Sequence, residues 1–250
     1  MFIYPAFFIQ MGLILSIETA TSVCSVAIGR DGELLALKEI HEGFSHAEKL
    51  TRCIETVCEE ASVLLADLDA VAVSSGPGSY TGLRIGVSTA KGLCFALDLP
   101  LISVPTLYGI AFGLRKKLVK ENANVLSTKE SKRKIYLIPM IDARRMEVYT
   151  SLYDIHLNVL SATHAEIIDE ASFSELRADG HVFFAGDGAV KLDQIFGDSE
   201  NVSIHADVLP SAAFFVAEAE RKLVNGETEN TSIFEPFYLK EYIPGKSKGQ

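Results

Sequence analysis

The chain has 250 residues, of which 48% are hydrophobic, so it can bury one large core or two moderate ones. Its 33 acidic residues outnumber its 23 basic residues, and the formal net charge is -10. Such a surface repels a phosphate backbone and disfavours autonomous nucleic-acid binding. The four cysteines form no CxxC pair, and no stretch reaches the roughly 20 apolar residues of a membrane span. We therefore expect a cytoplasmic protein that does not enter the membrane.

The first ten residues are apolar but lack the basic start and the cleavage site of a signal peptide. A strand is expected to begin at Leu13, directly after Met11. We therefore expect Met11 to be the natural start and residues 1–10 to be an N-terminal extension, with a short accessory strand as the alternative.

The first half of the chain opens with an antiparallel meander and then alternates strands and helices. Arg30-Asp31-Gly32 is a tight-turn signal, and Ser45 with Glu48 predicts a capping box at the start of an amphipathic helix. Alternation of strands with helices predicts parallel neighbours. The expected elements are strands at 12–18, 24–29 and 33–40, a helix at 45–61, a strand at 68–74, a helix at 81–97, a strand at 100–104 and a helix at 106–114.

Residues 115–134 hold eight basic residues against two acidic ones. Charge runs in loops usually stay solvated, so we expect a mobile connector that contacts RNA only weakly. Strands are then expected at 135–141, 147–153 and 182–185, and a helix at 211–224 with Ser211 as its N-cap. This predicts a first lobe at 11–114, the connector at 115–134, and a second lobe at 135–250, whose C-terminal helix packs within it or back on the first lobe.

A meander followed by α/β crossovers, occurring twice, is the layout of the actin, Hsp70 and sugar-kinase superfamily. The expected fold is thus a two-lobed actin-like ATPase (ribonuclease H-like) fold of mixed sheets with flanking helices. Active members carry an acidic residue after the first strand of each lobe, followed by Gly and Thr near phosphate. Here Glu18 and Asp142 occupy the two acidic positions, but the expected glycine follows neither of them. A capping or salt-bridge role is therefore favoured for both. With Gly186 and Gly188 they are candidates for weak nucleotide binding.

Motifs for catalysis are missing from the sequence. There is no G-x-x-x-x-G-K-[ST] loop, no HxxxH or HExxH pair, and no G-x-S-x-G elbow; His41 and His46 are five residues apart. The other histidines, His164 among them, are scattered and are expected to be isolated. We expect no catalytic residue, no bound metal and no cofactor.

The most specific stretch runs from Ser74 to Val87, a glycine-rich turn that leads directly into a helix. Glycine inside a helix costs about 1 kcal/mol relative to Ala, so Gly82 and Gly86 need an explanation. With Ala90 they form a small-residue groove that either packs within its own lobe or receives a partner helix. We predict the partner interface, flanked by three apolar residues of the preceding helix: Leu50, Ile54 and Val57.

Three stretches resemble the TsaB family of bacterial proteins: residues 14–19, residues 76–86 and the run Asp142-Ala-Arg-Arg-Met-Glu-Val-Tyr149. The resemblance implies a non-catalytic subunit of the machinery that installs threonylcarbamoyl on the adenosine beside the anticodon, in tRNAs that read codons beginning with A. It implies pairing with the catalytic subunit TsaD through the first two helices, and an assembly with the ATPase TsaE.

The same resemblance implies indirect contact with tRNA and allows a homodimer when the chain is alone. Glu18 and Met146 depart from the Asp and Gly that are frequent in the family. The alternatives are an ATP-dependent small-molecule kinase and an M22-like peptidase of the same superfamily.

Overall fold

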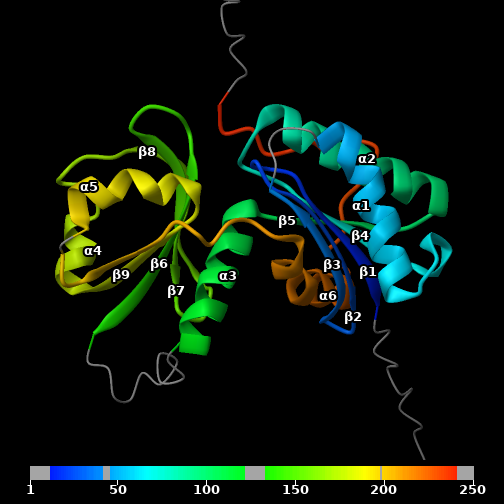
Figure 1. Cartoon of the computed structure of the whole chain (residues 1–250), viewed down its shortest axis with the longest axis horizontal. Coiled ribbons are helices and arrows are strands. Elements are labelled where there is room, and N and C mark those ends of the chain that lie inside the picture. The colour runs from blue at the N-terminus through cyan, green and yellow to red at the C-terminus, as the bar shows by residue number, and fades with distance from the viewer. Residues whose placement is uncertain (1–11, 42–45, 122–132, 198, 241–250) are drawn as a thin grey trace, which may run out of the picture. The chain divides into compact units, whose positions relative to one another are not determined.

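The computed structural model describes residues 12–41, 46–121, 133–197 and 199–240 (Figure 1). The expectations for residues 1–10, for the N-cap at Ser45 and for the centre of the basic connector lie outside the described residues. The chain divides into two compact units. Unit 1 comprises the described parts of Met1–Ser74, Ile85–Val104 and Ser211–Glu235, and unit 2 comprises Ser75–Arg84, Pro105–Pro210 and the described part of Pro236–Gln250.

Unit 1 is built on a five-stranded mixed sheet in the order β3-β2-β1-β4-β5. β1 pairs antiparallel with β2 and parallel with β4, so a meander leads into a parallel half. The tight turn predicted at Asp31 and Gly32 joins β2 to β3, and both residues have positive φ. The strands are β1 (Leu13–Glu18), β2 (Cys24–Arg30), β3 (Glu33–Ile40), β4 (Ala70–Ser74) and β5 (Leu101–Val104).

Helices cover both faces of the unit 1 sheet, which explains why β1, β2 and β4 read as nearly continuous apolar runs. Val26 and Ile28 belong to the core formed with α1 (His46–Ala61) and α2 (Tyr80–Leu97), whereas Ala27 between them packs with Ala212 and Val216. Figure 1 shows α1 and α2 on one side of this sheet and α6 (Val216–Val224) on the other. Short 3-10 turns precede β4 and α6: η1 (Leu65–Asp67) and η4 (Ala212–Phe214).

Unit 2 repeats this topology with the sheet order β10-β9-β6-β7-β8. β6 pairs antiparallel with β7 and parallel with β9, as β1 does with β2 and β4. The strands are β6 (Lys134–Asp142), β7 (Glu147–Asp154), β8 (Val159–Ile167), β9 (Gly180–Ala185) and β10 (Val202–His205).

The two faces of the unit 2 sheet carry different helices. Leu137 and Ile141 pack with the apolar side of α3 (Thr106–Glu121), while Ile138 and Met140 pack with residues of the short helices. The short helices are α4 (Ser174–Asp179), η3 (Asp187–Leu192) and α5 (Asp193–Phe196).

The shared strand order, two mixed sheets and flanking helices confirm the predicted fold class. The bounds differ from the expectation in several places. The helix expected to end at 114 continues through the first basic residues to Glu121, and it belongs to unit 2. The helix expected at 211–224 begins at Val216, after the η4 turn. It packs back on the first lobe, which is one of the two arrangements that the sequence left open, since Ser211–Glu235 belongs to unit 1 and α6 contacts β1, β2 and β5. β8, α4 and β10 were not expected at all.

Within the described part of the chain, no helix combines the length and the apolar character that a membrane crossing requires.

Candidate functional site

The carboxyl end of β1 is where the superfamily resemblance predicts an approach to phosphate. Glu18 is fully buried there, and its Oε1 accepts a hydrogen bond from the Ala20 amide. A Cβ built on Gly86 of α2 would lie 2.3 Å from Thr19 Oγ1. The helix therefore packs directly on the end of the strand. Thr19 of the same unit occupies the space that a side chain at Gly86 would need.

Burial sets the charge state of Glu18. Its pKa rises from 4.5 to about 7 because the charged carboxylate loses its hydration, and the hydrogen bond from the Ala20 amide only partly opposes this. The carboxyl accepts from a backbone amide two residues ahead, which is a capping contact. This is the structural role that the sequence favoured for Glu18.

The structure buries all of the residues predicted to meet a partner: Leu50, Ile54, Val57, Gly82, Gly86 and Ala90. Leu50, Ile54, Val57 and Ala90 belong to the core of unit 1, with at most 5% of their surface exposed. Their side chains therefore pack within unit 1, and their predicted contact with a partner stays a prediction. Periodicity located the apolar stripe of each helix, and that stripe packs on the helix's own sheet. That α1 and α2 face a partner stays a prediction.

The opposite face of α2 has an unusual composition for an exposed helix. Phe95 is 89% exposed. Gly92, one turn before it, has no atom within 4 Å of the position that a Cβ would occupy. Ser88 and Ala96 are exposed at the same spacing of four residues. The helix-propensity cost of Gly92 thus has no compensation within the described residues.

In unit 2, the acidic residue after the first strand forms a salt bridge. Asp142 pairs with Lys191 of η3, and its backbone amide donates to Asp187 Oδ1 at 3.0 Å. A Cβ on Gly186 would lie 2.1 Å from the Met140 carbonyl oxygen, and one on Gly188 would lie 2.9 Å from the Ile141 carbonyl carbon. Both glycines are required for packing against β6. The structure brings Asp142, Gly186 and Gly188 together, while Glu18 belongs to unit 1.

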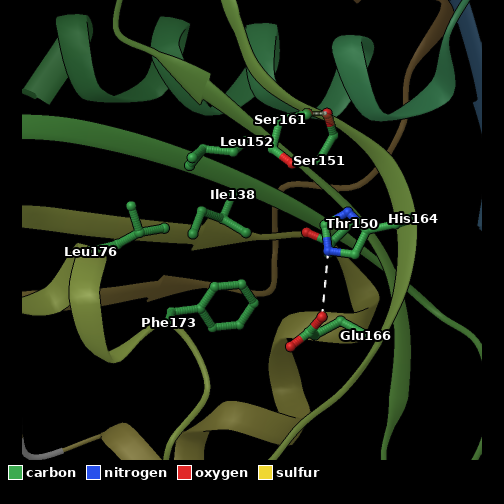
Figure 2. A pocket seen from close by; sticks show the side chains of 9 residues that line it. All are labelled: Ile138, Thr150, Ser151, Leu152, Ser161, His164, Glu166, Phe173 and Leu176. Carbon is green, nitrogen blue, oxygen red and sulfur yellow. Dashed lines mark hydrogen bonds and ion pairs between the residues drawn. The ribbon is translucent and has the colours of Figure 1, made fainter.

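A cavity of about 240 Å³ lies on the face of the unit 2 sheet that bears α4. Figure 2 shows Ile138, Phe173 and Leu176 on its apolar side, and His164 and Glu166 on its polar side. His164 Nε2 lies 3.4 Å from Glu166 Oε2, and Nδ1 lies 2.9 Å from the Ala162 carbonyl oxygen. The histidine that the sequence treats as isolated therefore has a carboxylate neighbour.

The cavity nevertheless lacks a nucleophile paired with a base. Thr150 donates its hydroxyl proton to the Pro139 carbonyl at 2.9 Å, and Ser151 donates to the Ser161 carbonyl at 2.7 Å. Both hydroxyls are thus committed to backbone rather than to His164. The arrangement can accept a small ligand, but it does not resemble a hydrolase centre.

Other reactive groups in the described residues are inert or dispersed. The four cysteines are free, and burial raises the pKa of Cys24 to about 12 and that of Cys94 to about 11, so thiolate is scarce at neutral pH. Within the described ranges, no group of three or more His, Cys, Asp or Glu side chains could hold a metal ion.

The comparisons with known proteins point in one direction. A family model described as "TsaD: tRNA N6-adenosine threonylcarbamoyltransferase" matches residues 43–219. The tRNA threonylcarbamoyladenosine biosynthesis protein TsaB of Escherichia coli is 30% identical over 238 residues, which cover 93% of this chain and 96% of that protein. The chain belongs to the TsaB family.

Two further relatives show how much of the chain each similarity covers. YeaZ from Pseudomonas aeruginosa is 25% identical, with a TM-score of 0.72 over 92% of this chain and all of the YeaZ chain. The tRNA N6-adenosine threonylcarbamoyltransferase of Pediococcus pentosaceus is 38% identical over 122 residues, but the match covers only 35% of that enzyme. The family membership thus extends over nearly the whole chain, whereas the likeness to the transferase is partial.

Sequence reasoning missed Gly92 and Phe95 on the exposed face of α2. It also missed His164 and Glu166, which line the cavity. Ser88, Gly92 and Ala96 show the same spacing of four as Gly82, Gly86 and Ala90, so a signal for the outer stripe was present. His164 and Glu166 alternate with Ala165 on β8, which places both on one face of the strand, but this strand was not predicted.

Proposed function

We propose that this chain is the non-catalytic partner subunit of a complex that forms threonylcarbamoyladenosine in tRNA. Membership of the TsaB family supports the pathway. The absence of a metal-binding group and of reactive thiolates among the described residues supports an accessory role. The chain then works in the cytoplasm and contacts tRNA through the complex.

The observation that carries the proposal is the outer face of α2. A phenylalanine with 89% exposure beside an open glycine is costly in an isolated protein, and both costs are offset when another helix packs there. Gly92 allows close backbone approach, and Phe95 supplies the apolar anchor. We assign this face, rather than the buried stripe, to the partner.

The occupant that we propose is the catalytic subunit TsaD, with the ATPase TsaE joining the assembly. The family model and the Pediococcus transferase indicate that TsaD shares part of this chain's sequence, so a related fold could present a matching pair of helices. A second copy of this chain would occupy the same face in the absence of TsaD. The two associations are therefore expected to exclude each other.

The proposal is tested by co-expression with the TsaD of the same organism and affinity capture. Phe95→Asp should weaken the complex by at least about thirtyfold, because a central interface anchor contributes about 2 kcal/mol or more. The thermal melting of the isolated variant should stay unchanged, since Phe95 is exposed.

The matched control is Leu35→Asp, which places the same charge at another exposed apolar residue of unit 1, on β3, and should bind normally. Normal binding of Phe95→Asp would remove this face from the interface. Hydrolysis of ATP or peptide by the isolated chain, if abolished in Glu18→Ala or Asp142→Ala, would replace the accessory role with a kinase or peptidase.

A further inference from the structure

The turn between β6 and β7 holds two successive arginines in a conformation that L residues rarely adopt. The backbone φ is 70° at Arg144 and 51° at Arg145. This left-handed region costs free energy for any residue with a Cβ, whereas glycine adopts it freely. Both arginines are exposed, so burial of their side chains does not offset the cost.

The backbone of the turn is held without the two side chains. The Ala143 amide donates to the Glu147 carbonyl, and the Glu147 amide donates to the Arg144 carbonyl, both at 3.1 Å. The Met146 carbonyl accepts from the Ile168 amide at 2.8 Å. The Arg144 amide donates to Asp142 Oδ1 at 2.6 Å, but neither guanidinium forms a hydrogen bond or an ion pair with any described residue. Glycine at both positions would satisfy the turn better, so the arginine side chains need another reason.

Two acidic groups beside the turn, Asp142 and Glu147, already have lysine partners. Lys191 pairs with Asp142 and also donates to the Glu147 carbonyl at 2.6 Å. Lys240 pairs with the Glu147 carboxylate. The positive charge of Arg144 and Arg145 is therefore left for a ligand, although the chain as a whole carries a net charge of -10.

We propose that Arg144 and Arg145 form a contact for the phosphate backbone of tRNA. The proposal rests on the proposed role in tRNA modification, which supplies the RNA. Arginine binds phosphate oxygens through two parallel N–H donors, and two neighbouring arginines can engage successive phosphates. An exposed turn offers charge without the walls that a mononucleotide needs for its base and sugar, which favours a repeating backbone.

The experiment uses the complex of the full chain with TsaD, because the chain is expected to contact tRNA within that complex, and measures fluorescence anisotropy with labelled unmodified tRNA at several salt concentrations. In the double variant Arg144→Gly/Arg145→Gly, tRNA affinity should fall at least about fivefold at low salt. The slope of log affinity against log salt should shrink by about 1 for each arginine. The same variant should melt about 2–4 °C higher, because glycine relieves the left-handed strain. Loss of binding together with a gain in stability would separate a ligand contact from a structural role.

Two control variants separate the effect of backbone strain from the effect of charge. Asp31→Gly relieves a comparable positive φ of 56° at the β2–β3 turn and should leave tRNA affinity unchanged. Arg30→Gln removes an exposed charge from unit 1 and should have little effect on tRNA affinity. ATP, added at the same total phosphate concentration as the tRNA, should displace little of the labelled tRNA.

Three results would overturn the proposal: a wild-type complex that does not bind tRNA at low salt, a glycine variant whose complex has unchanged affinity, or a glycine variant that melts earlier. Weakened capture of TsaD with unchanged tRNA affinity would assign the arginines to an acidic protein surface instead. The capture test with Phe95→Asp does not involve this turn, so failure of the RNA contact leaves the accessory function standing.

Discussion

The two faces of α2 use glycine for opposite reasons. On the inner face, Gly86 lets the helix rest on the end of β1, where a Cβ would overlap Thr19 Oγ1. On the outer face, Gly92 meets no other atom, and the next exposed side chain along that face is Phe95. Both residues carry the same intrinsic cost of about 1 kcal/mol relative to Ala. Only at Gly86 does the described structure account for that cost.

A small-residue stripe is therefore not by itself a sign of a partner. At Gly86 and Ala90 the inner stripe packs within unit 1, whereas no described side chain covers Gly92 on the outer stripe. Substitutions of equal size on the two faces should therefore have unequal effects on folding, and two matched pairs of variants measure this.

The largest effect is expected for Gly86→Leu. The added side chain overlaps Thr19 and should lower the free energy of unfolding by more than about 3 kcal/mol, the upper part of the range for overpacked cores. Ser88→Leu adds a side chain of similar size on the exposed face and should change stability by only about 0.5 kcal/mol. Denaturant unfolding measures the stability of both variants. Equal stabilities would show that the inner face can accommodate the added side chain.

The second effect concerns the buried carboxyl beneath α2 and depends on pH. Glu18 has a pKa of about 7 in the folded chain and 4.5 as the reference value for the unfolded chain, so the folded state retains a proton that the unfolded state has lost. Stability should therefore fall as pH rises from about 4.5 to 7, by about 3 kcal/mol, and then level off.

Glu18→Gln removes the titrating group and keeps an oxygen that can accept from the Ala20 amide. The variant should match the wild type near pH 4.5 and exceed it at pH 8, as measured by denaturant unfolding at both values. The exposed Glu59→Gln serves as the control and should follow the wild type at both pH values. A parallel pH dependence in Glu18→Gln and wild type would show that Glu18 is ionised in the folded chain.

The smallest effect is expected for Gly92→Ala. Alanine favours the helix by about 1 kcal/mol and meets open space, so thermal melting should rise by about 2–4 °C. Gly86→Ala, the same change on the inner face, should instead melt earlier. A lower melting temperature for Gly92→Ala would reveal a contact on the outer face within this chain.

Most of the fold could be predicted from local patterns. The apolar strands of unit 1 and the amphipathic helix α1 were found because burial on both faces of a sheet, or on one face of a helix, leaves a strong periodic signal. β8 was missed because it is an edge strand whose residues are mostly exposed or half-buried, so it shows no apolar run. α4 and β10 are too short to show a period, with 6 and 4 residues.

The candidate site was predicted less well than the fold. The buried Glu18 accepts a hydrogen bond from an amide only two residues along the chain, whereas Asp142 pairs with Lys191, which is distant in sequence. The roles of Gly186 and Gly188 depend on the carbonyls of β6, more than forty residues earlier in the chain. Such contacts leave no trace in local sequence.

By itself the sequence determined the α/β class, the family and the lack of recognised catalytic motifs, because these depend on residue type and spacing along the chain. Only the tertiary structure decided which stripe of α2 is buried, because Gly82, Gly86 and Ala90 share their spacing with Ser88, Gly92 and Ala96. It also decided that Arg144 and Arg145 adopt positive φ and that their guanidinium groups have no partner among the described residues, since both properties arise from the pairing of β6 with β7 and from lysines distant in sequence. Spacing along the chain defines candidate faces, and packing between distant segments selects among them.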